Sequence, residues 1–178
     1  WNATYDLPVM ITNCSNNYGP FQFPEKLIPV VIVNAIKQNT ISIYGKGENI
    51  RDWLHVNDHA EAVLKVLFNG NKGCKYNIGG ENETTNLELV SKICELMDQI
   101  YPTNKLKYSS LISFVEDRPG HDKRYAINSK LIRNELKWKP KISFNEGLKK
   151  TIKWYLNNEQ WWSYLLYRDK YLKNKNSK

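Results

Sequence analysis

Cysteine is scarce in this sequence, and long apolar runs are absent from it. The three cysteines, Cys14, Cys74 and Cys94, lie far apart among 178 residues and form no C-x-x-C pair. This spacing argues against a metal site, and the odd count favours a reducing compartment, so we expect a cytoplasmic protein. No stretch approaches the roughly 20 apolar residues of a membrane span, and no signal peptide is recognisable, so we expect no membrane partner.

A nucleic-acid-binding pattern is also missing, although the formal net charge is +8. Residues 168–178 contain five Lys or Arg against one Asp, so much of the excess positive charge lies in a basic tail. The other basic residues are scattered, with no arginine-rich stripe and no recognisable binding module. We therefore expect no nucleic-acid partner.

A dinucleotide-binding fingerprint is the third absence. No G-x-G-x-x-G occurs, and Gly45-Lys46-Gly47 continues into Glu48-Asn49-Ile50, which predicts a simple turn. The sequence begins with Trp1 instead of Met and opens directly into a polar and apolar stretch. We expect it to be a segment of a longer protein.

Short apolar runs alternate with amphipathic helical patterns along the chain. We expect strands at 8–12, 41–44, 52–56 and 76–78, a polar loop over 13–23, and helices at 24–38, 57–68, 128–136, from 86 onward and from 144 to the end. Asn57 or Asp58 is expected to cap the second helix, and Thr85 or Asn86 the third. This order predicts an α/β fold.

A charged Arg-Pro turn is the most informative motif. Pro119 fixes its own φ and biases Arg118 toward an extended backbone, and Gly120 can adopt conformations closed to other residues. The turn can hold a guanidinium, the His121 imidazole and the Asp117 carboxylate in a fixed relation, which suits a diphosphate beside a ribose. A solvated loop with incidental charges is the alternative interpretation.

Three blocks of the sequence form a recognisable combination. They are NCSNNYGP running into FPEKLIP (13–29), YGKG leading to IRDWLHVNDH (44–59), and DRPGHDKRYAI (117–127). The combination, which extends over about residues 7–154, resembles the extended short-chain dehydrogenase/reductase family. Within that family, the doubled asparagine and the third block are typical of the dTDP-glucose 4,6-dehydratases, whereas the Asn-Tyr-Gly-Pro turn is widely shared by nucleotide-sugar enzymes.

The resemblance implies an architecture: the last strands of a Rossmann-type parallel sheet plus a small mixed α/β substrate-binding domain. Residues 1–23 and 53–80 would be interleaved parts of the NAD(P)-binding Rossmann domain, 24–52 and 81–160 the nucleotide-sugar-binding domain, and 161–178 the end of the C-terminal helix and the basic tail. In this family the Gly-rich fingerprint, an Asp-Glu acid/base pair and a Tyr-x-x-x-Lys motif lie upstream of the first block. We expect none of them, and so no catalytic residue, in this segment.

The resemblance also implies the residues that bind ligands. The substrate-binding set is Asn16, Lys26, Leu27, Ser42, Ile43, Tyr44, Arg51, Asn86, Asp117, Arg118 and His121. Asn17 is expected to face NAD, the implied cofactor. Arg51 is the strongest candidate because a guanidinium can bind a diphosphate through two parallel hydrogen bonds. A salt bridge from Arg51 to Asp52 or Asp58 is the alternative.

Other residues of this set also have structural alternatives. Asn16 could belong to an ordinary Asn-rich loop, Lys26 could be a solvated lysine, Tyr44 could be a core residue, and Asn86 could serve as a helix cap. We expect purely structural roles for His55 and His59, and packing roles for the tryptophans around the C-terminal helix, Trp138, Trp154, Trp161 and Trp162.

The function implied by the resemblance is that of a lyase. The full-length enzyme would convert dTDP-glucose to dTDP-4-keto-6-deoxyglucose by oxidation at C4, loss of water across C5 and C6, and reduction at C6. We expect a dTDP-sugar as the partner, a homodimer for the full-length enzyme, and no activity of this segment alone. The alternatives are a nucleotide-sugar epimerase or decarboxylase of the same family, and a non-catalytic nucleotide-sugar-binding module.

Overall fold

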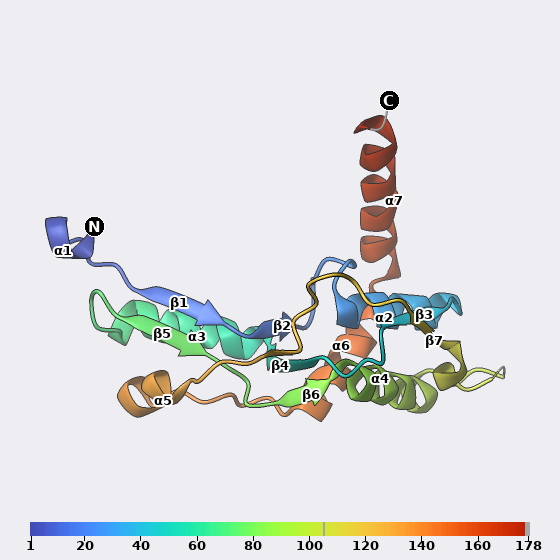
Figure 1. Cartoon of the computed structure of the whole chain (residues 1–178), viewed down its shortest axis with the longest axis horizontal. Helices are drawn as coiled ribbons and strands as arrows, with labels where there is room; N and C mark the ends of the chain where they lie inside the picture. Colours follow the sequence, from blue (N-terminus) through green and yellow to red (C-terminus); the bar gives the residue numbers. More distant parts are fainter. Residues whose placement is uncertain (105, 177–178) are drawn as a thin grey trace. The chain divides into compact units, whose positions relative to one another are not determined.

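The computed structural model describes residues 1–104 and 106–176, with side chains as far as Arg168. The elements in chain order are α1 (Asn2–Tyr5), β1 (Ile11–Cys14), β2 (Asn16–Tyr18), α2 (Leu27–Lys37), β3 (Ile41–Tyr44), β4 (Ile50–His55), α3 (Val56–Asn69), β5 (Lys75–Ile78), β6 (Glu83–Thr85), α4 (Asn86–Ile100), the 3-10 turn η1 (Tyr108–Leu111), β7 (Ile112–Val115), β8 (Arg124–Tyr125), α5 (Lys130–Leu136), α6 (Phe144–Asn157) and α7 (Glu159–Asn176) (Figure 1). The predicted α/β fold class is confirmed.

The chain divides into two compact units, each made of segments that are distant in sequence. Unit one consists of residues 1–19, 48–86 and 120–147, and unit two of residues 20–47, 87–119 and 148–178. The segment 120–147, which follows the Arg-Pro turn, therefore belongs with the strands of unit one. The assignment of a Rossmann part and a substrate-binding part to particular ranges stays a prediction.

In unit one, the chain passes from one parallel strand pair to another at a single residue. β1 pairs in parallel with β5 and β2 pairs in parallel with β4, and only Ser15 separates β1 from β2. The Ser15 N–H donates to the carbonyl of Ile78 at 3.0 Å, which continues the first pairing to its end. The prediction of a loop over 13–23 was wrong for Asn13 and Cys14, which end β1, and for Asn16–Tyr18. The reason is that β5 and β4 offer these residues backbone partners that local composition does not reveal.

β4 is the strand on which unit one is organised. Its first half pairs antiparallel with β6, from Ile50↔Thr85 to Asp52↔Glu83, and in parallel with β8, as Ile50↔Arg124 and Arg51↔Tyr125. Neither β6 nor β8 was predicted, because strands of three and two residues are too short to show a period-2 pattern.

The core of unit one lies between the β1–β5 pair and two helices. α3 contacts both strands and α5 contacts β5 (Figure 1). The buried side chains are Leu54, Ala62, Val66, Tyr76, Ile78, Ile132, Leu136 and Trp138, so the predicted packing role of Trp138 is confirmed. Val9 and Ile11 are exposed, although the run 8–12 predicted a buried strand, because the strand starts only at Ile11 and its alternation turns that side chain outward.

The start of α3 differs from the prediction. The N-cap is His55, whose Nδ1 accepts a hydrogen bond from the N–H of Asn57 at 3.2 Å, so the predicted caps Asn57 and Asp58 were wrong. Asp58 is buried and accepts hydrogen bonds from the N–H groups of Lys141 (3.1 Å) and Ile142 (3.0 Å). This carboxylate therefore fixes the backbone that precedes α6.

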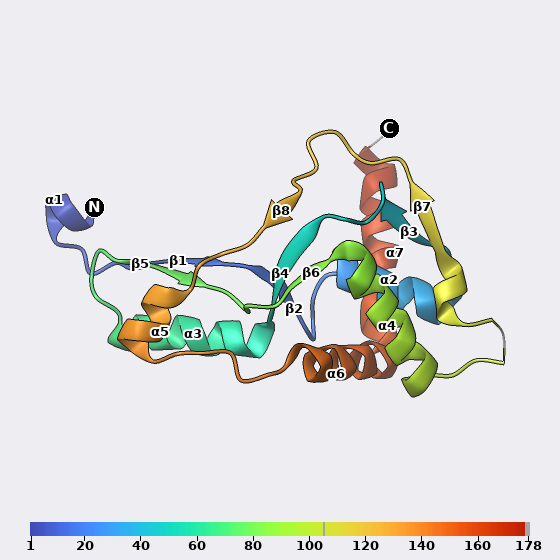
Figure 2. The ribbon, with the colours of Figure 1, turned by 60° about the horizontal axis from the view of Figure 1, so that its bottom comes forward.

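Unit two combines a parallel strand pair with helices. β3 pairs in parallel with β7 from Ile41↔Ile112 to Tyr44↔Val115 (Figure 2), and α2 contacts β3. The buried helical side chains of this unit include Ile28, Val31, Ile32, Leu89, Val90, Ile93, Leu96, Met97, Leu148, Ile152, Tyr155 and Trp162. The ring centroids of Trp154 and Trp161 lie 4.7 and 5.7 Å from the ring centroid of Phe21. These contacts confirm packing roles for both tryptophans.

The C-terminal region contains two helices where one was predicted. Asn158 separates α6 from α7, and its Nδ2 donates to the carbonyl of Trp154 at 2.8 Å. Its own carbonyl accepts from the N–H of Trp161 at 3.1 Å. The residue thus ends one helix and starts the next, although no proline or glycine marks the break. The predicted basic tail lies mostly outside the residues whose side chains are described.

Asp58→Ala is expected to destabilise the folded chain by about 2 kcal/mol, because it leaves two partly buried N–H groups without their acceptor. The free energy of unfolding from urea titration measures the effect. Glu61→Gln is the matched control, since Glu61 pairs with the neighbouring Lys141 side chain only at the surface. Equal unfolding free energies for Asp58→Ala and the unsubstituted chain would contradict this account.

Candidate functional site

Residues of the predicted binding set occur in both units, and each unit is described separately. Unit one holds Asn16, Asn17, Arg51, Asn86 and His121. Unit two holds Lys26, Leu27, Ser42, Ile43, Tyr44, Asp117 and Arg118.

Arg51, near the start of β4, is held by backbone oxygen atoms. Its Nη1 donates to the carbonyl of Ile50 at 2.7 Å and its Nη2 to the carbonyl of Asp122 at 2.9 Å. Two of the five N–H donors of a guanidinium are used in this way. The group is oriented, yet these contacts leave its positive charge without a counter-charge.

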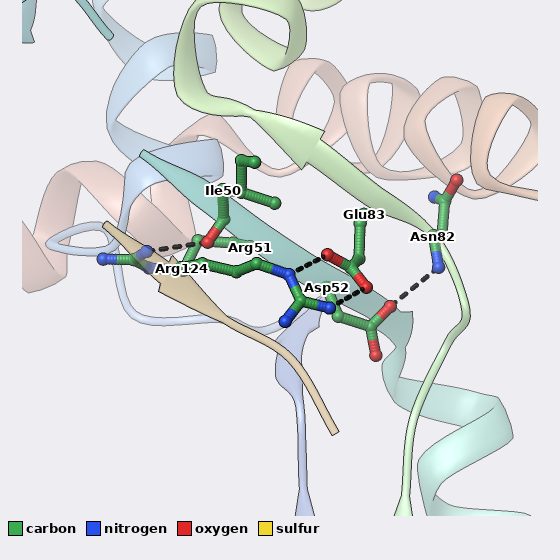
Figure 3. A network of polar contacts seen from close by, with 6 residues as sticks. All are labelled: Ile50, Arg51, Asp52, Asn82, Glu83 and Arg124. Carbon is green, nitrogen blue, oxygen red and sulfur yellow. Dashed lines mark hydrogen bonds and ion pairs between the residues drawn. The ribbon is translucent and has the colours of Figure 1, made fainter. Parts of the chain in front are cut away.

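The two carboxylates of the salt-bridge alternative, Asp52 and Asp58, accept hydrogen bonds from backbone N–H groups. Asp52 is buried and accepts hydrogen bonds from the N–H groups of Gly80 (2.9 Å) and Asn82 (2.7 Å), the second of which is drawn in Figure 3. Asp58 accepts from the loop before α6. Arg51 therefore donates to backbone carbonyl groups, and Asp52 and Asp58 accept from backbone N–H groups, while the anion-binding role of Arg51 stays a prediction.

A buried asparagine that was not predicted joins several predicted residues. Asn49 donates from Nδ2 to the carbonyl of Asp122 at 3.2 Å, and its own carbonyl accepts from the N–H of Asn86 at 3.0 Å. It thereby connects Arg51, Asn86 and the backbone next to His121 in one hydrogen-bonded cluster. The sequence gives no means of recognising Asn49. It directly precedes β4, but asparagine is frequent in this chain.

A second unpredicted contact ties the end of the Arg-Pro segment to the sheet. Arg124 on β8 donates from Nε (2.7 Å) and Nη2 (2.8 Å) to the two carboxylate oxygens of Glu83 on β6 (Figure 3). The hydrogen bonds from Arg124 lower the pKa of the Glu83 carboxyl, and the same bonds raise the pKa of the guanidinium. Both groups are therefore charged across the physiological pH range.

Asn16 and Asn17 lie at the carboxyl end of β1, the end of parallel strands at which ligands bind in α/β sheets. Asn16 is paired with Trp53, two residues along β4 from Arg51, so the register places Asn16 and Arg51 on one face of the sheet. Asn17 donates from Nδ2 to the carbonyl of Ser15 at 3.0 Å, which orients its amide.

In unit two, predicted residues gather at the carboxyl ends of β3 and β7. Ser42 and Tyr44 are exposed, whereas the Ile43 side chain is buried in the core between them. A side-chain contact to a ligand is therefore available to Ser42 and Tyr44, and Ile43 can offer only its backbone. Because Tyr44 is exposed, the alternative that it is a core residue was wrong.

The Asp117 carboxylate packs against the turn that ends β3. Gly45 has a φ of +55°, and a Cβ at this position would lie 3.1 Å from the Asp117 Oδ2. Asp117 also accepts a hydrogen bond at Oδ1 from the N–H of Arg118 at 2.9 Å. Tyr44, Asp117 and Arg118 are therefore near one another in unit two. Gly120 has a φ of +68° with no neighbouring atom within 4 Å of an added Cβ, so the requirement for glycine is conformational, as predicted.

Lys26 and Leu27 stand at the beginning of α2. Lys26 is the N-cap residue, is exposed, and pairs with Glu25 at 2.8 Å. Such a surface ion pair contributes little stability, so an anionic ligand can replace the carboxylate at small cost. No acidic residue occupies the first turn of α2, where the helix N-terminus favours negative charge.

The expected absence of a Tyr-x-x-x-Lys spacing was wrong as a statement about the sequence. The spacing occurs at Tyr101–Lys105 and at Tyr171–Lys175, both after the first block. α4 ends at Ile100 and Pro102 follows, so Tyr101 does not lie on a helix, and Lys105 is outside the described residues. The second pair falls where side chains are not described.

Other candidate groups do not add to the site. The three cysteines are free thiols, and burial raises the pKa of the Cys94 thiol to about 11, so it is protonated near neutral pH. Within the described residues there is no cluster of His, Cys, Asp or Glu that could hold a metal ion, and no helix has the length and apolarity needed to cross a membrane. A cavity of about 410 Å³ in unit one, lined by residues such as Tyr18, Trp53 and Phe144, includes none of the predicted binding residues.

Comparison with known proteins gives a consistent result. The family model described as GDP-mannose 4,6 dehydratase matches residues 1–151. A probable dTDP-glucose 4,6-dehydratase of Sinorhizobium fredii is 53% identical over 170 residues, which cover 96% of this chain and 48% of that protein. The chain thus spans about half the length of the curated relatives it matches.

Two crystal structures are similar over most of the chain. The dTDP-glucose 4,6-dehydratase of Bacillus anthracis in complex with NAD has a TM-score of 0.83 and 49% identity, covering 92% of this chain and 50% of that one. The dTDP-glucose 4,6-dehydratase of Streptomyces venezuelae with NAD and dTDP bound has a TM-score of 0.83 and 42% identity, covering 92% and 48%. These similarities confirm the resemblance carried by the three sequence blocks. Because the family model matches 1–151 of 178 residues, the chain belongs to the GDP-mannose 4,6 dehydratase family.

Proposed function

We propose that this chain is the substrate-binding, C-terminal part of a dTDP-glucose 4,6-dehydratase, the lyase that converts dTDP-glucose to dTDP-4-keto-6-deoxyglucose. The observation that carries the proposal is the Arg51 guanidinium, which two carbonyl groups hold in place and which lacks a counter-charge in these contacts. Relatives about 50% identical are named for this activity, which supports the choice of reaction.

In this proposal the residues of unit one bind the diphosphate and the sugar. Arg51 donates two parallel hydrogen bonds to diphosphate oxygens, because its planar fork matches their geometry. Asn86 and Asn16 have amides that can donate to and accept from hydroxyl groups. The Asn86 Oδ1 is buried without a hydrogen-bond partner among the described residues, so a ligand hydroxyl would satisfy it.

The residues of unit two bind the nucleoside end of the substrate. Tyr44 is exposed beside Ser42 and offers a ring face on which a pyrimidine can stack. Asp117 and Arg118 of the same unit offer a carboxylate and a guanidinium, groups that can bind a ribose hydroxyl and a phosphate. Lys26 and Leu27, at the start of α2, complete the proposed set.

NAD is the implied cofactor, and when bound it supplies the hydride acceptor and donor of the reaction. The described residues fit it only in part. Asn17, with its amide oriented at the carboxyl end of β1, can offer a polar contact, but the chain has no Gly-rich cradle for a pyrophosphate. What this chain contributes is binding and orientation of the sugar, which are themselves catalytic. The full-length enzyme is proposed to be a cytoplasmic homodimer.

Arg51→Ala in the intact enzyme is expected to weaken dTDP binding by about 2–4 kcal/mol, the scale for removing one partner of a charged pair. Arg51→Lys is expected to recover only part of the affinity, because a point charge cannot make the paired hydrogen bonds. Calorimetric titration with dTDP measures both. Arg133→Ala is the matched control, since Arg133 of the same unit pairs with Glu81. Unchanged affinity in Arg51→Ala would contradict the diphosphate contact, and unchanged affinity in Arg51→Lys would show that the paired hydrogen bonds are not needed.

The isolated chain of 178 residues is expected to show no turnover of dTDP-glucose and no tight binding of NAD. The reason is that none of the binding residues described here can cradle the dinucleotide pyrophosphate or remove the C4 hydroxyl proton. Incubation with NAD and dTDP-glucose, with the intact enzyme as the positive control, measures formation of the 4-keto-6-deoxy product. Product above background from the isolated chain would place the chemistry in residues that are assigned here to binding.

A further inference from the structure

β8 is a short, exposed strand that few contacts hold in place. It comprises only Arg124 and Tyr125, and both side chains are exposed. Its backbone pairs with the start of β4, and the N–H of Ile50 donates to the carbonyl of Lys123 at 2.8 Å. No side chain of β8 reaches the buried core of unit one, so polar contacts must fix this segment.

The Arg124–Glu83 ion pair is the side-chain contact that spans the sheet at this point. Glu83 lies on β6, opposite Asp52, and β6 and β8 flank the same half of β4. The Arg124 side chain therefore extends across β4 to reach Glu83, and the pair links three strands (Figure 3). Its two hydrogen bonds fix the direction of the guanidinium as well as its distance.

The register places this ion pair on the face of the sheet opposite Arg51. Arg124 is paired with Ile50 and Glu83 with Asp52, and in a strand the side chain of the intervening Arg51 points to the other face. The pair is thus separated from the ligand contact proposed for Arg51. The ion pair can therefore affect the contact between Arg51 and a ligand only by changing where β8 lies.

The position of β8 matters to Arg51 through one carbonyl group. The Asp122 carbonyl, two residues before β8, accepts from Nη2 of Arg51 at 2.9 Å and from Nδ2 of Asn49 at 3.2 Å. If β8 shifts along or away from β4, this carbonyl moves with it, and Arg51 loses one of the two acceptors that orient it.

We propose that Glu83 and Arg124 are positioning residues for the nucleotide-sugar site: their ion pair holds β8 on β4 and so keeps the Asp122 carbonyl at the Arg51 guanidinium. The inference rests on the proposed function, in which Arg51 binds the diphosphate. An exposed ion pair contributes little to overall stability. We therefore expect loss of the ion pair to reduce ligand affinity and to change the unfolding temperature only slightly.

The test uses the intact enzyme with Glu83→Gln, with Arg124→Gln, and with the exchanged pair Glu83→Arg/Arg124→Glu. We expect either single variant to weaken dTDP binding about fivefold, which corresponds to about 1 kcal/mol, with little change in the unfolding temperature. The exchanged pair is expected to recover part of the affinity. Glu95→Gln, which breaks the exposed Lys92–Glu95 pair of α4, is the matched control and leaves dTDP affinity unchanged.

A double-mutant cycle with Arg51→Ala decides between positioning and a general structural role. In the Arg51→Ala background, Glu83→Gln is expected to cause no further loss of dTDP affinity, because its effect passes through Arg51. An equal loss in both backgrounds, or no loss in either, would overturn the positioning role. If Arg51→Ala alone left dTDP affinity unchanged, the proposed function of Arg51 would fail instead, so the two failures are distinguishable.

Discussion

A hydrogen bond to one backbone carbonyl, that of Asp122, is the interaction on which the candidate site depends. Nη2 of Arg51 and Nδ2 of Asn49 both donate to it, and Asn49 in turn accepts from the N–H of Asn86. Through these bonds, residues 49–51, 86 and 122, which are far apart in sequence, form a single cluster in unit one. β4 supplies the frame, because β6 and β8 pair with the same half of it.

The electrostatics of the site follow from the partners of the nearby carboxylates. Asp52 and Asp58 are buried, and each satisfies its charge with two backbone N–H groups of a loop. Because a buried carboxylate must be hydrogen-bonded, these contacts are required by the fold, and they keep both acids away from Arg51. In the contacts described above, the Arg51 guanidinium is therefore bonded to carbonyl oxygens and to neither of these carboxylates.

The sequence was informative where a pattern is long and uninformative where structure depends on distant partners. The amphipathic helices and the strand Ile41–Tyr44 follow from periodicity, and the three blocks indicated the family. The short strands β2, β6 and β8 form because β4 pairs with them, which no local pattern shows. His55 caps α3 in place of Asn57, and Asn158 divides the C-terminal helices, because side-chain contacts decide between equally polar candidates.

The candidate site was predicted in the same uneven way. Arg51, Asn86 and the Arg-Pro turn followed from the resemblance and from the chemistry of their side chains. Asn49, Glu83 and Arg124 make contacts with neighbouring strands that no local pattern reveals. Arg124 lies in the third block, but nothing in the sequence pairs it with Glu83, and Asn49 is one of many asparagines. Ile43 was included in the predicted set, yet the alternation of β3 buries its side chain.

A crystal structure of the intact enzyme with dTDP bound tests most directly whether Arg51 binds the diphosphate. We expect the Arg51 guanidinium to donate two hydrogen bonds to the diphosphate, at about 2.7–2.9 Å, while it retains its bond to the Asp122 carbonyl. A diphosphate bound away from Arg51, or an Arg51 side chain paired with Asp52 or Asp58 in that complex, would contradict the account.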